Sequence, residues 1–298
     1  MSGRMGAILE TVKLPHMLFA LPFAVVGAFW AAGGLPGGAE IALVLVAMVS
    51  AHVAGMAFNR VVDARLDAAN PRTRDRAIPS GRLSRRAVAG LSLAGAAGFV
   101  AAAAAFWPLS GTAWPVVLAL PFLAVLCGYS YTKRFTSLSH YVLGLALGLA
   151  PVGAWIALAG GAAWQPVVLG GAVLFWAAGF DILYSLQDMN HDRSAGLRSI
   201  PSRLGAAGAL RVARVNHALG VVLLAVPYVA DGGQDMSGGV TLGPWYAAGV
   251  VVFGGLMVYE HALIRAGDLR RLDRAFFAVN ASGSILFAGL AVVDVLAG

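Results

Sequence analysis

Nine long apolar segments, separated by short polar connections, dominate this 298-residue sequence. A helix needs about 20 mostly apolar residues to cross the hydrocarbon core of a bilayer, and the segments have roughly that length. The composition agrees, because 59% of the residues are hydrophobic and only 12% are charged, which is unusual for a water-soluble domain. The sequence therefore predicts an all-α, polytopic membrane protein in which residues 1–298 form a single helical bundle. The nine predicted spans are residues 14–33, 41–58, 87–106, 113–131, 138–159, 166–186, 206–230, 245–263 and 275–296.

Small residues are frequent within these segments, and the chain contains 38 glycines. Glycine lets membrane helices approach closely, so a tightly packed bundle is expected. The first segment follows Arg4 and Lys13 and ends in small residues, as a secretory signal does, but eight further apolar segments favour a retained span. The single cysteine, Cys127, excludes an intramolecular disulfide and offers no zinc or iron–sulfur cluster.

The basic residues predict the orientation of the bundle. All of them precede the first predicted span or lie in alternate connections, namely at Arg4 and Lys13, in 60–86, at Lys133 and Arg134, in 193–214 and in 265–274. The other connections carry only Glu40, Asp231 and Asp235, and Asp294 lies near the end of the chain. By the positive-inside rule, the N-terminus and the basic loops face the cytoplasm of a bacterial-type inner membrane. The net charge of +7 thus reflects topology, and no nucleic-acid partner is expected.

A first acidic motif occupies residues 59–81. Asn59, Asp63 and Asp67 stand at positions i, i+4 and i+8, so a helix would place them on one face. Two carboxylates one turn apart repel each other unless a cation lies between them, and a purely oxygen-based ligand set suits Mg²⁺. The loop that follows supplies Arg72 and Arg76.

A second acidic motif occupies residues 181–205. It contains Asp181, Tyr184, Asp188 and Asp192 at i, i+3, i+7 and i+11, which again predicts one helical face. Asp181 lies about two turns inside the end of its predicted span. An ionisable group at that depth is costly unless it serves a site or has a partner. The following loop carries Arg198.

The two motifs form an internal pseudo-repeat. Asp63 and Asp188 have the same separation along the chain as Asp67 and Asp192, and an Ile-Pro-Ser string follows each motif. Solvated ion pairs at the end of a span would explain one such motif, but two at matched positions on the same membrane face favour a shared site. Such a site would hold a diphosphate through Mg²⁺, while arginine side chains bind the outer oxygens.

These residues resemble the motifs of the UbiA superfamily of intramembrane aromatic prenyltransferases. The first resembles Asn-Asp-x-x-Asp-x-x-x-Asp, and the second resembles Asp-x-x-Tyr-x-x-x-Asp-x-x-x-Asp. The resemblance covers most of the chain, including the spans, both Pro-Ser loops and the segment Tyr131-Thr-Lys133-Arg134. Two positions depart from it: Arg60 stands where many members have a second Asp, and Arg198 stands where a Lys often precedes the Ser.

The resemblance implies a Mg²⁺-dependent prenyltransferase of ubiquinone or menaquinone biosynthesis. Its donor would be a polyprenyl diphosphate, and its acceptor an aromatic acid of the 4-hydroxybenzoate or dihydroxynaphthoate type; the sequence looks most like the bacterial 4-hydroxybenzoate polyprenyltransferase-like enzymes. The allylic diphosphate would ionise, and an electron-rich ring carbon would attack. The implied metal ligands are Asp63, Asp67, Asp188 and Asp192, which form the catalytic set together with Asp181 and Tyr184 near the acceptor. Substrate binding would fall to Asn59, Arg72, Arg76, Lys133, Arg134 and Arg198, with the prenyl tail in an apolar channel between spans.

Several alternatives stay open or can be excluded. A prenyltransferase of this type could use another acceptor, such as homogentisate, haem or a glycerol-phosphate lipid. A secondary transporter would carry its ionisable groups near the bilayer midplane, whereas here the acidic residues gather at one face. The motifs lack the Asp-Gly and Gly-x-x-x-Asp elements of a CDP-alcohol phosphotransferase. The histidines show no metal-ligand spacing and are not expected to be ligands, although His191, between two motif aspartates, could reach the site.

Overall fold

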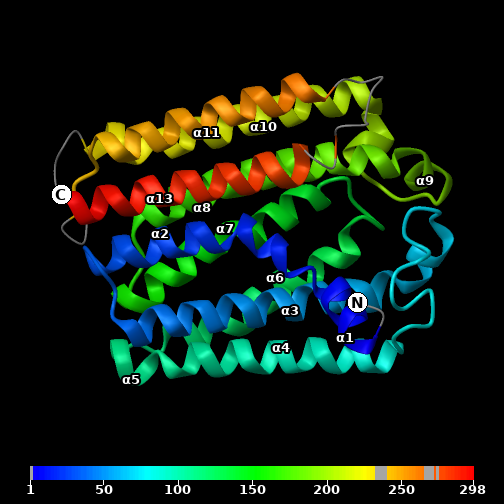
Figure 1. Ribbon diagram of the computed structural model, residues 1–298, viewed down its shortest axis with the longest axis horizontal. Coiled ribbons are helices and arrows are strands. Elements are labelled where there is room, and N and C mark those ends of the chain that lie inside the picture. The colour runs from blue at the N-terminus through cyan, green and yellow to red at the C-terminus, as the bar shows by residue number, and fades with distance from the viewer. Residues whose placement is uncertain (1–2, 232–239, 265–271, 273–274) are drawn as a thin grey trace.

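The computed structural model describes residues 3–231, 240–264, 272 and 275–298, and every regular element in that part of the chain is helical (Figure 1). The elements are α1 (Arg4–Val12), η1 (Leu14–Phe19), α2 (Leu21–Ala32), α3 (Gly38–Ala69), α4 (Arg85–Ala105), α5 (Trp107–Ser110), α6 (Trp114–Thr132), α7 (Ser139–Ala159), α8 (Trp164–Tyr184), η2 (Ser185–Asp188), α9 (Met189–Ser194), α10 (Ile200–Asp231), α11 (Pro244–Leu263), η3 (Ala275–Val279) and α13 (Asn280–Ala297). Within the described residues, eight helices are long and apolar enough to cross a membrane, and a bent helix pair at the N-terminus can supply a ninth span. The predicted all-α, multi-pass membrane bundle is confirmed.

The first predicted span is not one straight helix. Its N-terminal part forms the 3₁₀ helix η1, and α2 starts only at Leu21. The helical stretches Arg4–Phe19 and Leu21–Ala32 are bent by 47° relative to each other. Pro22 in the first turn of α2 explains the break, because proline has no N–H to continue the helical hydrogen bonds and its ring clashes with the carbonyl four residues earlier. The bend turns η1 towards the interior of the bundle, where Phe19 is buried.

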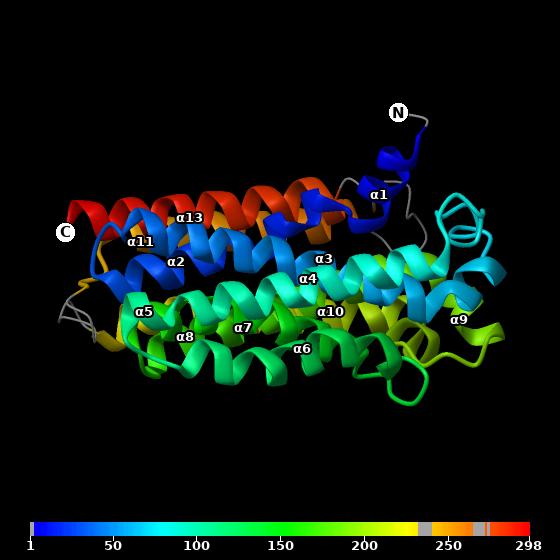
Figure 2. The ribbon, with the colours of Figure 1, turned by 90° about the horizontal axis from the view of Figure 1, so that it is seen from below.

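The long helices run side by side along a common direction, with the two chain ends at opposite ends of the bundle (Figures 1 and 2). The contact between α7 and α8 shows why the glycines matter. A Cβ atom added at Gly144 or Gly148 of α7 would lie 2.3 Å from the carbonyl oxygen of Leu174 or Gly170 of α8. Only glycine allows these two backbones to come so close, so the predicted tight packing through small residues is confirmed here.

The two acidic motifs fold differently. The first lies on α3, which continues unbroken to Ala69. The second starts on α8, passes through the 3₁₀ turn η2 and ends on α9, so the predicted continuous helix through Asp192 is interrupted after Tyr184. A 3₁₀ turn has about three residues per turn instead of 3.6 and shifts the direction of the following side chains. Both motifs and their loops lie at the end of the bundle that also holds the N-terminus (Figure 1).

Candidate active site

A cavity of about 340 Å³ opens between α3, α6, α7 and α8 at the motif-bearing end of the bundle. Its size is in the range of small-molecule sites. The predicted site residues that line it are Asn59, Asp63, Asp67, Arg72, Arg76, Lys133, Asp181, Tyr184, Asp188 and Asp192. The structure therefore brings both acidic motifs to one cavity, as the pseudo-repeat predicted.

The same cavity continues into the bundle as an apolar arm. Along α3, the lining extends from Asn59 back to Met48, about 16 Å at 1.5 Å per residue, and His52 is the polar residue between these two. The arm is lined by Met48, Ala51, Gly55, Phe122, Leu126, Leu143, Ala146, Leu147 and Ala150. The cavity thus combines a charged end with a space suited to a hydrocarbon chain.

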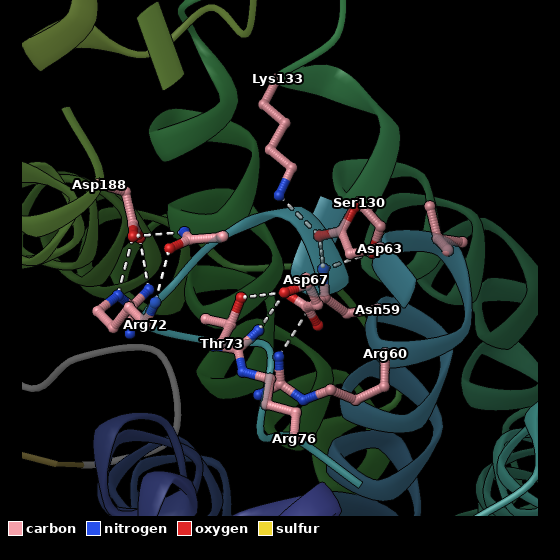
Figure 3. A network of polar contacts seen from close by, with 12 residues as sticks. Asn59, Arg60, Asp63, Asp67, Arg72, Thr73, Arg76, Ser130, Lys133 and Asp188 are labelled. Carbon is pink, nitrogen blue, oxygen red and sulfur yellow. Dashed lines mark hydrogen bonds and ion pairs between the residues drawn. The ribbon is translucent and has the colours of Figure 1, made fainter. Parts of the chain in front are cut away.

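Asp63 is the most heavily paired carboxylate of the first motif. Its side chain is 4% exposed; Lys133 Nζ donates to Oδ2 at 2.7 Å and Arg134 Nη2 donates to Oδ1 at 3.0 Å (Figure 3). The Asn59 amide donates to Asp63 Oδ2 at 3.1 Å and to Ser130 Oγ at 3.3 Å. These contacts tie α3 to the C-terminal end of α6, which explains why the Lys133-Arg134 pair lies between the two motifs in the sequence.

Only one of the two carboxylate oxygens of Asp67 has a hydrogen-bond partner among the described residues. Arg76 Nη1 donates to Asp67 Oδ1 at 2.7 Å, whereas Asp67 Oδ2 is buried and has no hydrogen-bond partner among the described residues. The Thr73 hydroxyl donates to the Asp67 backbone carbonyl at 3.0 Å and holds the following loop against the end of α3. A buried carboxylate oxygen without a donor is costly, so Asp67 Oδ2 is a natural ligand position for a cation that enters the cavity.

Asp188 links the second motif to the loop of the first. Arg72 donates to its two oxygens from Nε at 2.8 Å and Nη2 at 2.5 Å, and Asn70 Nδ2 donates to Oδ1 at 2.9 Å (Figure 3). Arg72 Nη1 also donates to the Tyr184 hydroxyl at 3.2 Å. Burial by itself lowers the pKa of the Arg72 guanidinium, but the hydrogen bonds and charge of Asp188 raise that pKa above its ordinary value. Arg72 therefore stays charged in the site.

Asp181 has an unexpected partner in His140 on α7. His140 is 3% exposed, and its Nδ1 lies 2.6 Å from Asp181 Oδ2. His140 Nε2 accepts a hydrogen bond from the backbone N–H of Ile200 at 3.4 Å, which assigns the proton to Nδ1 and makes it the donor to Asp181. His140 was not among the predicted site residues. The available signal was an ionisable residue just inside a predicted span, where such a group is costly unless it has a partner.

Two predicted substrate-binding residues do not line the cavity. Arg134 donates from Nη2 to Asp63 Oδ1, and its Nη1 donates to the Ser130 carbonyl at 2.6 Å. Arg198 points elsewhere: its Nη1 donates to the Phe135 carbonyl at 2.7 Å, and its backbone N–H donates to the Lys133 carbonyl at 2.8 Å. Arg198 therefore connects the loop that follows α6 to the loop that follows α9.

Asp192, by contrast, lines the cavity, where Ser199 is its hydrogen-bond partner.

The carboxylate oxygens of the cavity suit a magnesium ion that binds together with the substrate. Among the described residues, no three carboxylate, imidazole or thiol side chains form a ready-made metal cluster. Asp63, Asp67 and Asp188 are each neutralised by Lys or Arg, and the unpartnered oxygen belongs to Asp67. Mg²⁺ commonly uses one or two carboxylates together with substrate phosphates and water, so an incomplete set of oxygen ligands agrees with this ion.

Comparisons with known proteins show the family to which this chain belongs. The 4-hydroxybenzoate octaprenyltransferase of Aromatoleum aromaticum is 29% identical over 100% of this chain and 97% of that protein. The 4-hydroxybenzoate octaprenyltransferase of Methylobacillus flagellatus is 29% identical over 90% of this chain and 86% of that protein. The apo structure of a UbiA homolog from Aeropyrum pernix K1 has a TM-score of 0.81 and 32% identity, with 94% and 98% of the two chains covered. A UbiA homolog from Archaeoglobus fulgidus bound to DMAPP and Mg²⁺ shares the fold, with a TM-score of 0.67, 19% identity and coverage of 96% and 99%. Since the model of the UbiA prenyltransferase family also matches residues 20–282, the chain belongs to the UbiA prenyltransferase family.

Proposed function

We propose that this protein transfers a polyprenyl group from a polyprenyl diphosphate to a ring carbon of an aromatic acid of the 4-hydroxybenzoate type, in ubiquinone or menaquinone biosynthesis. The observation that carries the proposal is the single cavity in which a charged end, lined by both acidic motifs, continues into an apolar arm. The charged end suits a diphosphate and the arm suits its prenyl chain. Relatives named 4-hydroxybenzoate octaprenyltransferase support the acceptor class.

Asp63, Asp67, Asp188 and Asp192 would hold Mg²⁺ in this site. When bound, the ion would neutralise the charge that develops on the leaving diphosphate. A UbiA homolog from Archaeoglobus fulgidus is bound to DMAPP and Mg²⁺, which supports a role for Mg²⁺ beside a prenyl diphosphate. Arg72, Arg76 and Lys133 would move from the aspartates to oxygens of the anionic substrates, because a charge-assisted hydrogen bond to a phosphate or carboxylate oxygen of the substrate replaces the one to aspartate.

The pair of Asp181 and His140 would receive the proton of the reaction. As the new carbon–carbon bond forms and the bond to diphosphate breaks, the attacked ring carbon loses its hydrogen as a proton, and the electron pair of that bond restores aromaticity. Asp181 lines the cavity and has a carboxylate oxygen beyond the one that faces His140. His140 donates a hydrogen bond from Nδ1–H to Asp181 and so would keep the carboxylate oriented and ionised.

We expect the acceptor to need its carboxylate. Arg60, Arg72, Arg76 and Lys133 line the charged end of the cavity, whereas Arg134 and Arg198 do not. These four cations are more than one diphosphate uses, and we expect Arg72, Arg76 or Lys133 to bind the carboxylate of the acceptor. A charge-assisted hydrogen bond to a carboxylate is worth about 1.5 to 3 kcal/mol, or roughly ten- to a hundredfold in affinity.

Steady-state kinetics with purified protein test this expectation. 4-Hydroxybenzoate and 1,4-dihydroxy-6-naphthoate are compared with their decarboxylated analogues at a fixed concentration of prenyl diphosphate. We expect kcat/KM to be roughly ten- to a hundredfold higher for the acids. Equal values for acids and analogues would direct the search to neutral phenols or to alcohols.

The charge pattern further supports an orientation with the motif-bearing loops in the cytoplasm of a bacterial-type inner membrane. Single cysteines introduced into a Cys127→Ala background test it. Positions 80 and 194, both exposed at the motif-bearing end, should react with an impermeant maleimide only from the cytoplasmic side, and positions 39 and 162 only from the other. Reaction of both groups from the same side would contradict the topology. The segment 231–239, which the sequence also places outside, is for the most part not among the described residues.

A further inference from the structure

Arg60 is a buried cation in the wall of the active-site cavity. It follows Asn59 on α3 and is 8% exposed. Its side chain lines the main cavity and also a smaller one of about 30 Å³, which lies under the loop that follows α3 and shares Asp67 and Arg76 with the main cavity. In the sequence, Arg60 is only a departure from a family motif, and it is not among the predicted site residues.

Three other cations of the cavity lining each pair with a carboxylate, whereas Arg60 has no ion pair among the described residues. Arg72 pairs with Asp188 at 2.5 Å, Arg76 with Asp67 at 2.7 Å and Lys133 with Asp63 at 2.7 Å. Among the described residues, the hydrogen bond of the Arg60 guanidinium is a long one, 3.5 Å from Nη1 to the neutral amide oxygen of Asn59 (Figure 3). Its five N–H donors are therefore mostly unused.

The charges around Arg60 do not compensate for its burial. Asp63, Asp67 and Glu10 act on it favourably through space, but the Arg76 guanidinium lies close enough to repel it. All three carboxylates are already paired with other cations. A buried charge without a dedicated partner destabilises a fold, and an apolar side chain of similar volume is often more favourable. Arg60 thus weakens the empty site, and an anion in the cavity would reverse that effect.

We propose that Arg60 binds the diphosphate of the prenyl donor directly. This inference rests on the proposed function and deepens it, because it adds a ligand for the same substrate group. The planar guanidinium presents two parallel N–H donors that match two phosphate oxygens. A diphosphate between Arg60 and Arg76 also removes the repulsion between these two cations. Part of the substrate charge is then neutralised by the protein itself, so diphosphate binding keeps a component that does not depend on metal.

The test measures binding of a non-reactive thiolodiphosphate analogue of geranyl diphosphate to the full-length protein in nanodiscs. The variants are Arg60→Met, which removes charge and hydrogen bonds, and Arg60→Gln, which keeps an N–H donor for Asn59. Arg65→Met is the matched control, because Arg65 lies on the same helix but is exposed and does not line the cavity. Each protein is titrated once with Mg²⁺ and once with EDTA, and its thermal midpoint is recorded without ligand.

We expect Arg60→Met and Arg60→Gln to weaken binding about tenfold or more, with Mg²⁺ and with EDTA alike. Their ligand-free thermal midpoints should equal or exceed that of the wild type, since a buried charge has been removed. Arg65→Met should match the wild type in both measurements. A merely structural role for Arg60 predicts the opposite pattern, with a lower midpoint and unchanged affinity.

Two results would overturn the proposal. The first is wild-type affinity in Arg60→Gln, whatever Arg60→Met does to the midpoint. The second is a loss of affinity that appears only with Mg²⁺ and not with EDTA, because Arg60 would then act through the metal site. If the wild type itself does not bind the analogue under either condition, the proposed function fails together with the inference.

Discussion

Replacing Asp63 or Asp188 with asparagine should lower turnover at least about a hundredfold while the protein stays folded. Asparagine has nearly the same shape but carries no charge, so it holds neither Mg²⁺ nor the cations that the carboxylate orients. Asp63 positions Lys133 at 2.7 Å, and Asp188 positions Arg72 at 2.5 Å. We expect the same direction for Asp67→Asn and Asp192→Asn, because these carboxylates line the same cavity.

The measurement is kcat at saturating Mg²⁺, with thermal unfolding of each variant to confirm that it folds. Asp75→Asn is the control, because Asp75 lies in the loop after the first motif but is exposed and away from the cavity lining. It should keep wild-type turnover. A double variant such as Asp63→Asn with Asp188→Asn that retained near wild-type activity would remove the metal-diphosphate assignment.

The second large effect is expected at Asp181. Replacing it with asparagine should lower kcat by about 10²–10⁴-fold, the usual contribution of a positioned acid or base. Binding of the non-reactive prenyl diphosphate analogue should change little, because Asp181 lies deeper than the metal-binding carboxylates. His140→Phe should lower kcat less, since it removes the hydrogen bond at 2.6 Å but leaves the carboxylate in place.

An isotope effect separates this role from a packing role. With 4-hydroxybenzoate deuterated at its reactive ring positions, the Asp181→Asn variant should show a primary isotope effect on kcat, because loss of the ring proton becomes slow. The matched control is Asp294→Asn, at the opposite end of the bundle, where Asp294 accepts hydrogen bonds from the backbone N–H groups of Gly243 and Trp245. It should show no isotope effect. A slow Asp181→Asn variant without an isotope effect would mean that Asp181 acts on a step other than proton removal.

Much of the architecture could be predicted because a lipid bilayer requires spanning segments to be apolar and to satisfy their own backbone hydrogen bonds. In a bilayer, hydropathy indicates which segments form spanning helices, and the distribution of Lys and Arg predicts their orientation. The first motif was predicted well because α3 is regular, so the spacing of Asn59, Asp63 and Asp67 translates directly into one face. The second motif was predicted less well. The turn η2 interrupts its helix, and no residue spacing signals a switch from α-helical to 3₁₀ geometry.

The pairing of side chains from different helices could not be predicted. His140 and Asp181 are 41 positions apart, and Arg72 and Asp188 are 116 positions apart. Periodicity relates residues on one helix, whereas contacts between helices depend on the packing of the whole bundle. The sequence named Arg198 among the substrate-binding residues because it is basic and near the motif. The structure places its guanidinium on the Phe135 carbonyl, away from the cavity lining.

The mass of the lipid product tests the central claim most directly. Purified protein in nanodiscs is supplied with a polyprenyl diphosphate, Mg²⁺ and 4-hydroxybenzoate, and the extracted lipid is analysed by mass spectrometry before and after mild alkaline treatment. The account predicts a product with the mass of the acid plus the prenyl group minus one hydrogen, resistant to alkali because the new bond is between carbons. A product that alkali cleaves back to 4-hydroxybenzoate, or no product beyond that of the Asp63→Asn, Asp188→Asn double variant, would contradict it.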